Sequence, residues 1–371
     1  MDVTLNKKLL LLCAAMLLAC SGGCGAQDKE KPEIEMVELQ GGTFWMGSPS
    51  GCPGPKEYPG SCEPEPYRYD SEVLHKVTLT RGFYLSKYET TQEEFHALTG
   101  NYWLTIYDNI HQELKICPRC PTSGINRYVA IAYANLYSKS RGYKPCYRLS
   151  NIKCVNGIET DDFMDCFLGD VISCGQWSSD EKGNKICVHE VKYTNSIDYA
   201  DVELNGVESP YDCKGYRLPT DAEWEYAARA GSNTPVYPSP GNDGTISAKE
   251  CEFDENMDKI AWYCGNAQEA QEVGQKAPNA WGLYDMIGNA NEWVWDNFGK
   301  YAIEEGDEVV DPYQPIEPID DIPINNLTGI SRSDGFTDLK FLRSSNREPL
   351  GASSPRFGFH FTGFRLARTT L

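Results

Sequence analysis

NAWGLYDMIGNANEWVWD, residues 279–296, is the stretch of this sequence that decides the fold. Its last part, residues 292–296, alternates so that two tryptophans share one face, with the period of two that is typical of a β-strand. Gly282 and Gly288 permit backbone conformations that other residues avoid. The stretch therefore predicts an irregular loop that leads into a core strand with one aromatic face.

Two carboxylates, Asp285 and Glu292, stand on either side of this irregular loop. Calcium binds several hard oxygen ligands, from carboxylates and main-chain carbonyls, in a flexible shell. The carbonyl groups of Gly288 and Ala290 are free for that role, because an irregular loop does not use them in a strand ladder. The loop is therefore a candidate calcium site. The alternative is a metal-free turn with solvated carboxylates.

Two short segments carry the signals that begin and end a helix. Thr91–Glu94 and Thr220–Glu223 have the capping-box pattern, in which the threonine hydroxyl and the glutamate each bond a free amide of the first turn. Gly100 and Gly231 follow them as suitable ends. A third helix is predicted over residues 127–141, where apolar residues recur at helical spacing.

Alternating segments before the first helix predict two pairs of strands. Residues 34–39 and 43–48 flank two glycines and are expected to form a hairpin. Residues 75–80 and 83–85 are expected to form a second pair. Strands and helices do not alternate regularly, so the predicted class is α+β, loop-rich and with little regular secondary structure, rather than a doubly wound sheet.

The 371-residue chain has 40% hydrophobic residues and a formal net charge of -20 at pH 7. This apolar fraction is enough for one large core or two modest ones, so the chain is expected to be globular. The acidity argues against nucleic acid or an anionic membrane surface as a partner, because like charges repel. No nucleic-acid function is therefore expected.

The first 19 residues have the pattern of an export signal, with two lysines before a run of leucine and alanine too short to span a membrane as a mature helix. Small residues precede Cys20, as in a bacterial lipobox. We expect a lipid on Cys20, a flexible tether over residues 20–34, and a location in the cell envelope. Ser21 favours the outer membrane or the cell surface. The alternative is ordinary secretory cleavage near Ala26.

Three of the fifteen cysteines lie in the first 24 residues, which leaves an even set of twelve. An exported chain keeps such cysteines as disulfides. Cys52 with Cys62 and Cys251 with Cys264 are the expected short pairs, although spacing alone does not fix the connectivity. The CxxC segment 117–120 is expected to form a plain disulfide. A redox-active pair and half of a zinc site are the alternatives.

Five segments, in order along the chain, resemble the successive motifs of the formylglycine-generating enzyme, or sulfatase-modifying factor, domain family. They are MVELQGGTFWMGS (36–48), FYLSKYETTQEEF (83–95), YRLPTDAEWEYAARAG (216–231), NAWGLYDMIGNANEW (279–293) and TGFRLAR (362–368). The resemblance implies one domain over residues 35–371 with a C-type-lectin-like fold and several disulfides. It also implies a structural calcium, because Asp285, Gly288, Ala290 and Glu292 match the family's ligand positions.

Two stretches depart from the family's pattern. Residues 154–213 separate motifs that are adjacent in shorter relatives, and we interpret them as an inserted, cysteine-rich loop. Residues 304–323 are acidic and rich in proline, which is typical of a solvated loop without a packed core.

The family's oxidases bind copper with two cysteines near the C-terminus and, with oxygen, convert the cysteine of a Cys-x-Pro-x-Arg motif to formylglycine. Soft thiolates suit copper(I). The corresponding region, residues 332–347, has no cysteine, and none follows Cys264. Copper and the oxidase reaction are therefore not expected. A histidine-bound iron, used in another branch, is not expected either, because the five histidines stand singly in unrelated segments.

Arg343, Ser344, Ser345 and Arg347 lie on the strand that carries the ligand cleft in the family. Because arginine forms bidentate contacts with carboxylates, these residues are candidates for binding an anionic or polar ligand. In so acidic a chain, the alternative is that the two arginines form internal ion pairs.

Together these observations predict a cell-envelope lipoprotein whose domain is a non-catalytic binding or scaffold module. Calcium would stabilise it, and its ligand would be an unidentified protein or glycan. The alternative function is a formylglycine-generating oxidase that acts on a cysteine of an exported sulfatase. A purely structural surface protein is the third. The missing C-terminal cysteine pair separates the first function from the second.

Overall fold

The computed structural model describes residues 33–100, 116–167, 170–179, 185–194, 196–299, 303–314, 328–333, 338–351 and 362–370. The chain divides into two units, Met1–Glu33 and Ile34–Leu371, and the features below belong to the second. The expected export signal, Cys20 and most of the tether lie outside the described residues, as do residues 315–323 of the expected acidic loop. No helix of the described part is long and apolar enough to cross a membrane.

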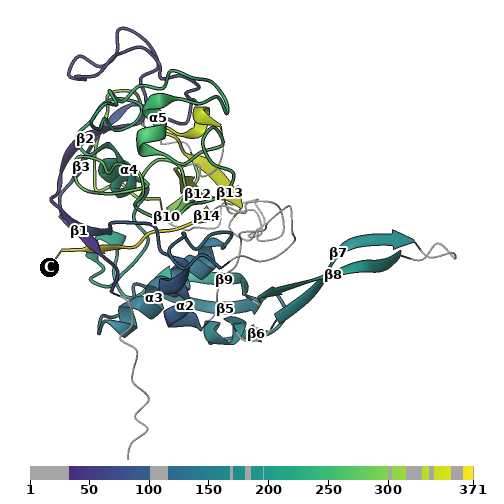
Figure 1. Cartoon of the computed structure of the whole chain (residues 1–371). Coiled ribbons are helices and arrows are strands. Elements are labelled where there is room, and N and C mark those ends of the chain that lie inside the picture. Colours follow the sequence, from purple (N-terminus) through teal and green to yellow (C-terminus); the bar gives the residue numbers. More distant parts are fainter. Residues whose placement is uncertain are drawn as a thin grey trace, which may run out of the picture. The chain divides into compact units, whose positions relative to one another are not determined.

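The first four strands of the domain do not form two separate hairpins. Instead, the segment that holds the first two strands pairs with the segment that holds the next two. β1 (Met36–Leu39) pairs antiparallel with β4 (Phe83–Ser86), and β2 (Gly42–Met46) pairs antiparallel with β3 (His75–Leu79). The expected hairpins, β1 with β2 and β3 with β4, are therefore wrong. The four strands form one long antiparallel ribbon that is divided between two sheets (Figure 1).

Two glycines explain why the chain does not turn back after β1. A Cβ atom at Gly41 would lie 2.5 Å from the carbonyl oxygen of Leu79, and one at Gly42 would lie 2.6 Å from the hydroxyl of Tyr226. Neither glycine has the positive φ that tight hairpin turns use. The glycines serve close packing, and the alternating pattern alone does not specify which strands pair.

Short strands from the C-terminal half complete the sheets. β15 (Ala367–Thr369) pairs antiparallel with β4, and β11 (Glu308–Val310) runs parallel to β3. A further sheet has four strands, in the order β13 (Glu348–Gly351), β12 (Thr328–Arg332), β10 (Asn291–Asn297) and β14 (Thr362–Gly363). The motif near 362–368 therefore contributes to two sheets.

Three of the four described α-helices begin where their sequence signals predict, namely α2 (Gln92–Thr99), α3 (Arg127–Ser140) and α4 (Asp221–Arg229). The fourth, the short α5 (Glu255–Ile260), was not predicted. The two predicted capping boxes, at Thr91 and Thr220, are both formed. α3 begins after Asn126, whose side-chain oxygen accepts from the amide of Val129 at 3.0 Å. The local helix predictions are confirmed, to within one residue for α3.

β10 is the predicted core strand, but it is buried on both faces. Trp293 and Trp295 pack into one hydrophobic cluster with residues of α3 and β5 (Tyr147–Cys154). Val294 packs into a second cluster with residues of β3 and α4. Because side chains alternate along a strand, Glu292 and Asp296 share the face of Val294. Both carboxylates are therefore inside the protein, where they need internal partners.

The expected insertion is built mainly from strands. From its start it contains β6 (Glu159–Thr160), η1 (Phe163–Phe167), β7 (Asp170–Ser179), β8 (Lys185–Thr194), β9 (Ile197–Leu204) and η2 (Pro210–Asp212). β5 pairs with β6 and β9, whereas β7 and β8 pair with each other as a two-stranded sheet (Figure 1). A short η4 (Leu339–Phe341) follows much later in the chain.

Five disulfides join described residues. They are Cys52–Cys62, Cys117–Cys120, Cys146–Cys213, Cys154–Cys166 and Cys251–Cys264. The two predicted short pairs and the CxxC disulfide are confirmed. Together with the mixed helices, short strands and long loops, they confirm the predicted loop-rich α+β fold.

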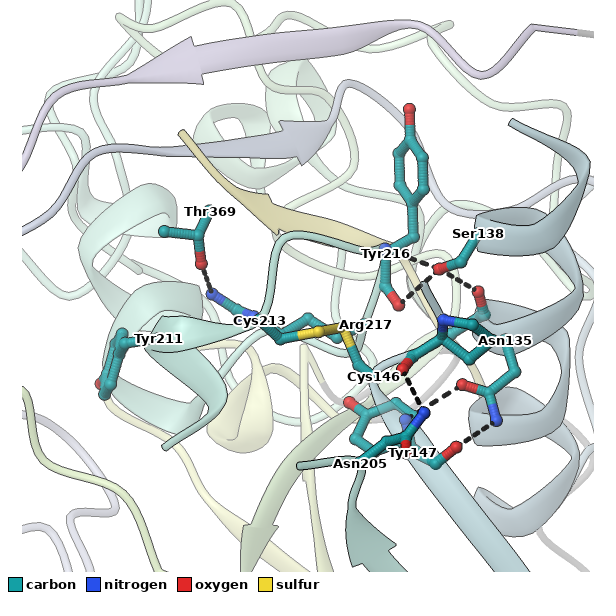
Figure 2. The surroundings of a disulfide bond; sticks show 12 residues. Asn135, Ser138, Cys146, Tyr147, Asn205, Tyr211, Cys213, Tyr216, Arg217 and Thr369 are labelled. Carbon is teal, nitrogen blue, oxygen red and sulfur yellow. Dashed lines mark hydrogen bonds between the residues drawn. A yellow bond between two sulfur atoms is a disulfide. The ribbon is translucent and has the colours of Figure 1, made fainter. Parts of the chain in front are cut away.

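The base of the insertion is closed by the Cys146–Cys213 bond, which spans 67 residues. Figure 2 shows this bond beside α3. There the Asn135 side chain donates to the carbonyl oxygen of Tyr147 at 2.9 Å, and the Ser138 hydroxyl accepts from the amide of Tyr216 at 2.7 Å. Covalent and hydrogen-bonded contacts thus hold the insertion to the core.

Candidate functional site

A buried ion pair lies at the strand end of the loop that the sequence singled out. Glu292 accepts from Arg365 at both oxygens, Nε to Oε2 and Nη2 to Oε1, each at 2.7 Å. Nε1 of Trp224, from α4, donates to Oε2 at 2.8 Å. All three side chains are 0% exposed. A carboxylate has roughly four acceptor positions, so Oε1 of Glu292 keeps one for another partner.

The loop before β10 has a strained and closely packed backbone. Asp285 has a φ of 53° and Gly288 a φ of 78°, and a Cβ at Gly288 would lie 2.3 Å from the carbonyl oxygen of Trp262. Oδ2 of Asp285 accepts from the amide of Gly274 at 2.7 Å, and the carbonyl oxygen of Gly288 accepts from the Ser333 hydroxyl at 3.1 Å. These oxygens are fixed in place and keep spare acceptor positions.

A third carboxylate, Glu89, meets the same loop and was missed in the sequence. Its Oε1 accepts from the amide of Ala290 at 2.9 Å, and its Oε2 accepts from the side chain of Asn289 at 2.8 Å. Burial, and then the charges of Asp285 and Glu292, raise the pKa of Glu89 well above its ordinary value. Glu89 and Asn289 are 200 residues apart, so no local pattern marks the contact.

Around this loop, three carboxylates interact with two cations, Arg365 and Lys276. Three buried carboxylates, Glu89, Asp285 and Glu292, lie around the guanidinium of Arg365. Burial raises the pKa of Asp285 to about 6, although the Gly274 amide and Arg365 lower it. An unbalanced buried charge is costly unless a proton or a cation neutralises it. The oxygen donors and their charge therefore fit a hard divalent cation such as calcium.

Side chains alone do not complete such a site. Among the described residues, the one group of three acidic, histidine or cysteine ligand atoms within 4.8 Å of one another is the disulfide-bonded Cys52 and Cys62 with Glu63. A cation at the loop would therefore also need the main-chain oxygens of Gly288 and Ala290. The ligand set Asp285, Gly288, Ala290 and Glu292 therefore stays a prediction.

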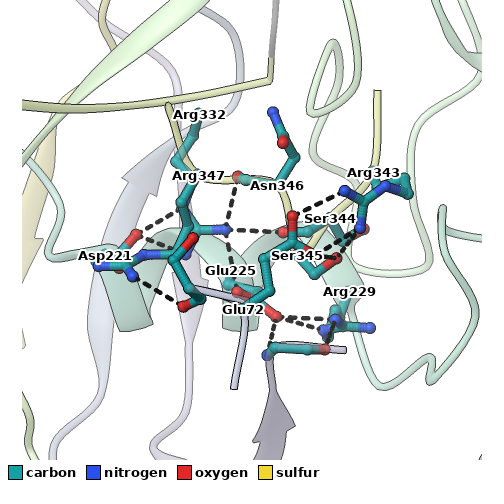
Figure 3. A network of polar contacts seen from close by, with 12 residues as sticks. Glu72, Asp221, Glu225, Arg229, Arg332, Arg343, Ser344, Ser345, Asn346 and Arg347 are labelled. Atoms are coloured by element: carbon teal, nitrogen blue, oxygen red, sulfur yellow. Dashed lines mark hydrogen bonds and ion pairs between the residues drawn. The ribbon is translucent and has the colours of Figure 1, made fainter. Parts of the chain in front are cut away.

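The four residues of the predicted ligand cleft lie in the turn between η4 and β13 and not on the predicted strand. They belong to a second buried polar network (Figure 3). Arg343 donates to both oxygens of Glu72, Nη1 to Oε2 at 2.6 Å and Nη2 to Oε1 at 2.7 Å. The Ser345 hydroxyl donates to Oε2 of Glu65 at 2.7 Å, and Arg343 lies 3.1 Å from the same oxygen. One half of the network thus ties the segment after η4 to the loop before β3.

The other half of the network centres on Asp221, the first residue of α4. Its Oδ2 accepts from Nε of Arg347 at 2.7 Å, and its Oδ1 accepts from Nε of Arg332 at 2.5 Å. Arg332 also lies 3.0 Å from Oε2 of Glu225. The charged atoms of Arg343 and Arg347 therefore face carboxylates of their own chain, and ligand binding by them stays a prediction.

Asp296 approaches this network from β10. Its Oδ2 accepts from the amide of Asp221 at 2.7 Å, and its Oδ1 accepts from the amide of Gln314 at 2.6 Å. Burial, and then the charge of Asp221, raise the pKa of Asp296 to about 7. This carboxyl group therefore titrates near neutral pH, although nothing in its strand pattern signals it.

Two polar side chains beside the network have unused hydrogen-bonding groups. Within the described part of the chain, the Ser344 hydroxyl and both amide atoms of Asn346 are buried and have no hydrogen-bonding partner. Figure 3 shows the Asn346 side chain directed away from the ion pairs. Buried polar groups normally have partners, so these atoms are unusual in a protein interior. Both residues are 0% exposed.

The described elements form a loop-rich α+β domain with five disulfides. The chain belongs to the sulfatase-modifying factor enzyme 1-like domain family, whose model matches residues 24–370. The family predicted from the five motifs is therefore confirmed.

Known proteins resemble the chain over different lengths. Chaperone protein LppX of Paenibacillus barcinonensis is 28% identical over 238 residues, which cover 59% of this chain and 64% of that protein. The formylglycine-generating enzyme of Mycobacterium tuberculosis is 38% identical over 89 residues, which cover 23% of this chain and 28% of that enzyme. The matched segments thus span less than two thirds of either relative.

A solved structure resembles the whole domain. Treponema denticola variable protein 1 superposes with a TM-score of 0.61 at 22% identity, over 91% of this chain and 96% of that protein. At this level of identity the likeness shows the shared fold.

Proposed function

We propose that the protein is an exported, lipid-anchored member of its family that binds a polypeptide and does not perform the oxidase reaction. The observation that carries the proposal is the lack of any cysteine after Cys264. Thiolate ligands for copper(I) are therefore missing from the region that would hold them. Arg343 and Arg347, in that region, pair instead with Glu72 and Asp221.

Two observations support a polypeptide as the ligand. The Paenibacillus relative is named a chaperone protein. In this chain, the amide of Asn346 and the hydroxyl of Ser344 have no partner among the described residues, and they lie among the predicted cleft residues. An amide side chain offers both donors and an acceptor, which are the groups that pair with a peptide backbone.

The binding proposal is tested with an unfolded polypeptide that contains no free thiol, for which reduced and S-carboxymethylated lysozyme is a suitable fluorescent probe. We expect saturable binding in an anisotropy titration. Asn346→Leu should weaken it by about tenfold, because a hydrogen-bonding partner is lost. Glu203→Gln, in the exposed pair with Arg148, is the matched control and should bind normally. Absence of saturable binding by the wild type contradicts the proposal.

Export and anchoring belong to the same proposal. Ten of the twelve cysteines beyond the first 24 residues form the five described disulfides, as suits an oxidising compartment. Cys20 would carry the lipid and hold the protein at a membrane, at the outer membrane or the cell surface. Metabolic labelling with a fatty acid should mark the wild type and not Cys20→Ala. Equal labelling of both proteins would contradict this assignment.

A structural calcium is the second part of the proposal. Asp285 and Glu292 would supply carboxylate oxygens, Gly288 and Ala290 would supply carbonyl oxygens, and Glu89 would add negative charge. The spare acceptor positions and the excess of buried carboxylate support this ligand set. Bound calcium would neutralise that charge and stabilise the folded state.

Thermal unfolding tests the calcium assignment. We expect a chelator to lower the Tm by several degrees and calcium to restore it, because a cation that binds the folded state alone stabilises it by mass action. Asp285→Asn should lose most of this response. Glu203→Gln, an exposed carboxylate, should keep it. An unchanged wild-type Tm would remove calcium from the account.

The alternative function, a formylglycine-generating oxidase, draws support from the 38% identity to the mycobacterial enzyme over 89 residues. Copper(I) separates the two functions. We expect no copper(I) transfer to the protein from a bathocuproine complex, because the described disulfides leave no C-terminal thiolate pair. Stoichiometric transfer would favour the oxidase.

A further inference from the structure

The Cys117–Cys120 disulfide closes a much shorter loop than the other described bonds. Its cysteines are 3 residues apart, whereas the other four pairs are separated by 10 to 67 residues. A crosslink restrains the unfolded chain less as the loop it closes becomes shorter. Of the five described bonds, this one is therefore expected to stabilise the folded state least.

The loop keeps its shape through backbone contacts that do not involve the sulfur atoms. Three amides from outside the loop donate to its carbonyl oxygens: Gln92 to Cys120 at 3.0 Å, Glu93 to Pro118 at 2.9 Å, and Val273 to Arg119 at 3.0 Å. In return, Oε1 of Gln92 accepts from the amide of Cys117 at 3.1 Å. Because α2 and the segment before β10 hold the loop on two sides, the disulfide can open without unfolding it.

The two cysteines differ in their access to solvent. Cys117 is partly exposed, whereas Cys120 is 3% exposed and its Sγ lies 3.8 Å from the carbonyl oxygen of Ala270. A thiolate from solvent therefore reaches Cys117, and Cys120 is the leaving group. After Cys120 has taken up a proton, its thiol can donate to the carbonyl oxygen of Ala270.

One large apolar side chain is exposed next to Cys117. Ile116 is 50% exposed directly before it, and Pro118 and Arg119 are exposed directly after it. Ile116 thus offers one aliphatic contact beside the accessible disulfide. A CxxC spacing is also typical of redox-active cysteine pairs.

We propose that Cys117 and Cys120 form a thiol–disulfide exchange site that oxidises a pair of cysteines in another exported polypeptide. A substrate thiolate attacks Sγ of Cys117, the bond to Cys120 breaks, and Cys120 leaves as a thiolate that takes up a proton. The second substrate thiolate then attacks the mixed disulfide and releases Cys117. The substrate loses two electrons and two protons, and the protein gains them.

Return to the disulfide form needs an oxidant. A second disulfide, either oxidised glutathione or that of a separate envelope oxidoreductase, accepts the two electrons by the same exchange. This activity goes beyond the proposed binding function. It uses neither the calcium loop nor the predicted cleft, and its substrate must carry free thiols.

Selective reduction of the wild-type protein is the first test. The oxidised protein is incubated with reduced glutathione, quenched with acid and alkylated, and the labelled cysteines are identified by peptide mass mapping. The Cys52–Cys62 bond, with Cys52 exposed, is the internal control. We expect Cys117–Cys120 to open at least about tenfold faster. Opening of Cys52–Cys62 at the same rate or faster would overturn the proposal.

Turnover of a reduced peptide with two cysteines flanked by apolar residues is the second test, with oxidised glutathione as the oxidant. Cys117→Ser/Cys120→Ser should reduce oxidation to the uncatalysed rate, and Cys52→Ser/Cys62→Ser should leave it unchanged. Cys120→Ser should trap a peptide on Cys117, and a wild-type rate from the first double variant would overturn the proposal. Binding of the carboxymethylated probe, which lacks thiols, should persist in all these variants, so that the two functions fail separately.

Discussion

Arg365 connects the last motif of the chain to the loop before β10. It bonds Glu292 through two nitrogens, and the carbonyl oxygens of Tyr284 and Ser86 accept from it at 3.0 Å. A buried pair of this kind contributes little net stability, but loss of one partner leaves a buried charge. Glu89 and Asp285 nearby make that loss more costly, because like charges repel.

Replacing the arginine tests this residue-scale argument. In the presence of chelator, Arg365→Met should lower the free energy of unfolding by about 3–5 kcal/mol, because Glu292 is left without its cation. Arg148→Met removes the partner of an exposed glutamate and should cost about 1 kcal/mol or less. Urea unfolding measures both values. Similar small losses in the two variants would show that the buried pair is not required.

The carboxyl group of Asp296 makes stability depend on pH. Its pKa rises from an ordinary 3.8 to about 7 on folding, so the folded state binds the proton more tightly. The stabilisation from this proton is present below about pH 4 and is lost as the pH rises through about 7. We expect a loss of up to about 1.4 kcal/mol per pH unit in that window.

Urea unfolding between pH 4 and 8 checks the sign of this effect. Asp296→Asn loses one of the two amide hydrogen bonds at every pH, but it should flatten this part of the pH dependence. Asp221 and Arg347, which face the group, remain in the variant as the local charges. A variant with the full wild-type slope would assign the pH dependence to another group.

At the scale of elements, the long ribbon of β1, β2, β3 and β4 depends on close backbone contacts at its middle. Gly41→Ala should lower the free energy of unfolding by about 1–3 kcal/mol, because the new Cβ meets the backbone oxygen of Leu79. Gly42→Ala should cost less, because its Cβ meets the end of the Tyr226 side chain, which can move. Thermal unfolding of both variants measures the difference. Equal losses would contradict this reading of the ribbon.

Helix caps depend on residues close together in the sequence, whereas strand pairing depends on residues far apart. The capping boxes at Thr91 and Thr220 could be predicted, because each uses residues only three positions apart. The pairing of β1 with β4 could not, because the alternating pattern is the same for any partner. Glu89 could not be predicted either, because its contacts come from residues some 200 positions later in the chain.

At the scale of the whole molecule, the insertion joins the core through Cys146–Cys213. Loop-closure entropy for a separation of 67 residues predicts a loss of about 4 kcal/mol for Cys146→Ser/Cys213→Ser. The same relation gives about 2 kcal/mol for the separation of 3 in Cys117–Cys120. Denaturant unfolding of the two double variants compares these values. A larger loss at Cys117–Cys120 would show that the short bond is structural.

The fold leaves the chemistry open, because one architecture supports different functions through different sites. Here the shared motifs form the sheets, the helix caps and the buried ion pairs, and of these the caps could be predicted from the sequence. The region after Cys264 keeps that framework without a cysteine. We therefore expect the protein to have the fold of the family without the reaction of its oxidases.

Mass spectrometry of a Cys-x-Pro-x-Arg peptide tests this expectation most directly. The peptide is incubated with the full mature protein, copper(I) and oxygen, beside an active formylglycine-generating enzyme as the control. The account predicts that the peptide cysteine is not converted to the aldehyde, because no thiolate pair is present after Cys264. Formation of the aldehyde, at any rate above that without protein, would contradict this prediction and show that the protein is an oxidase.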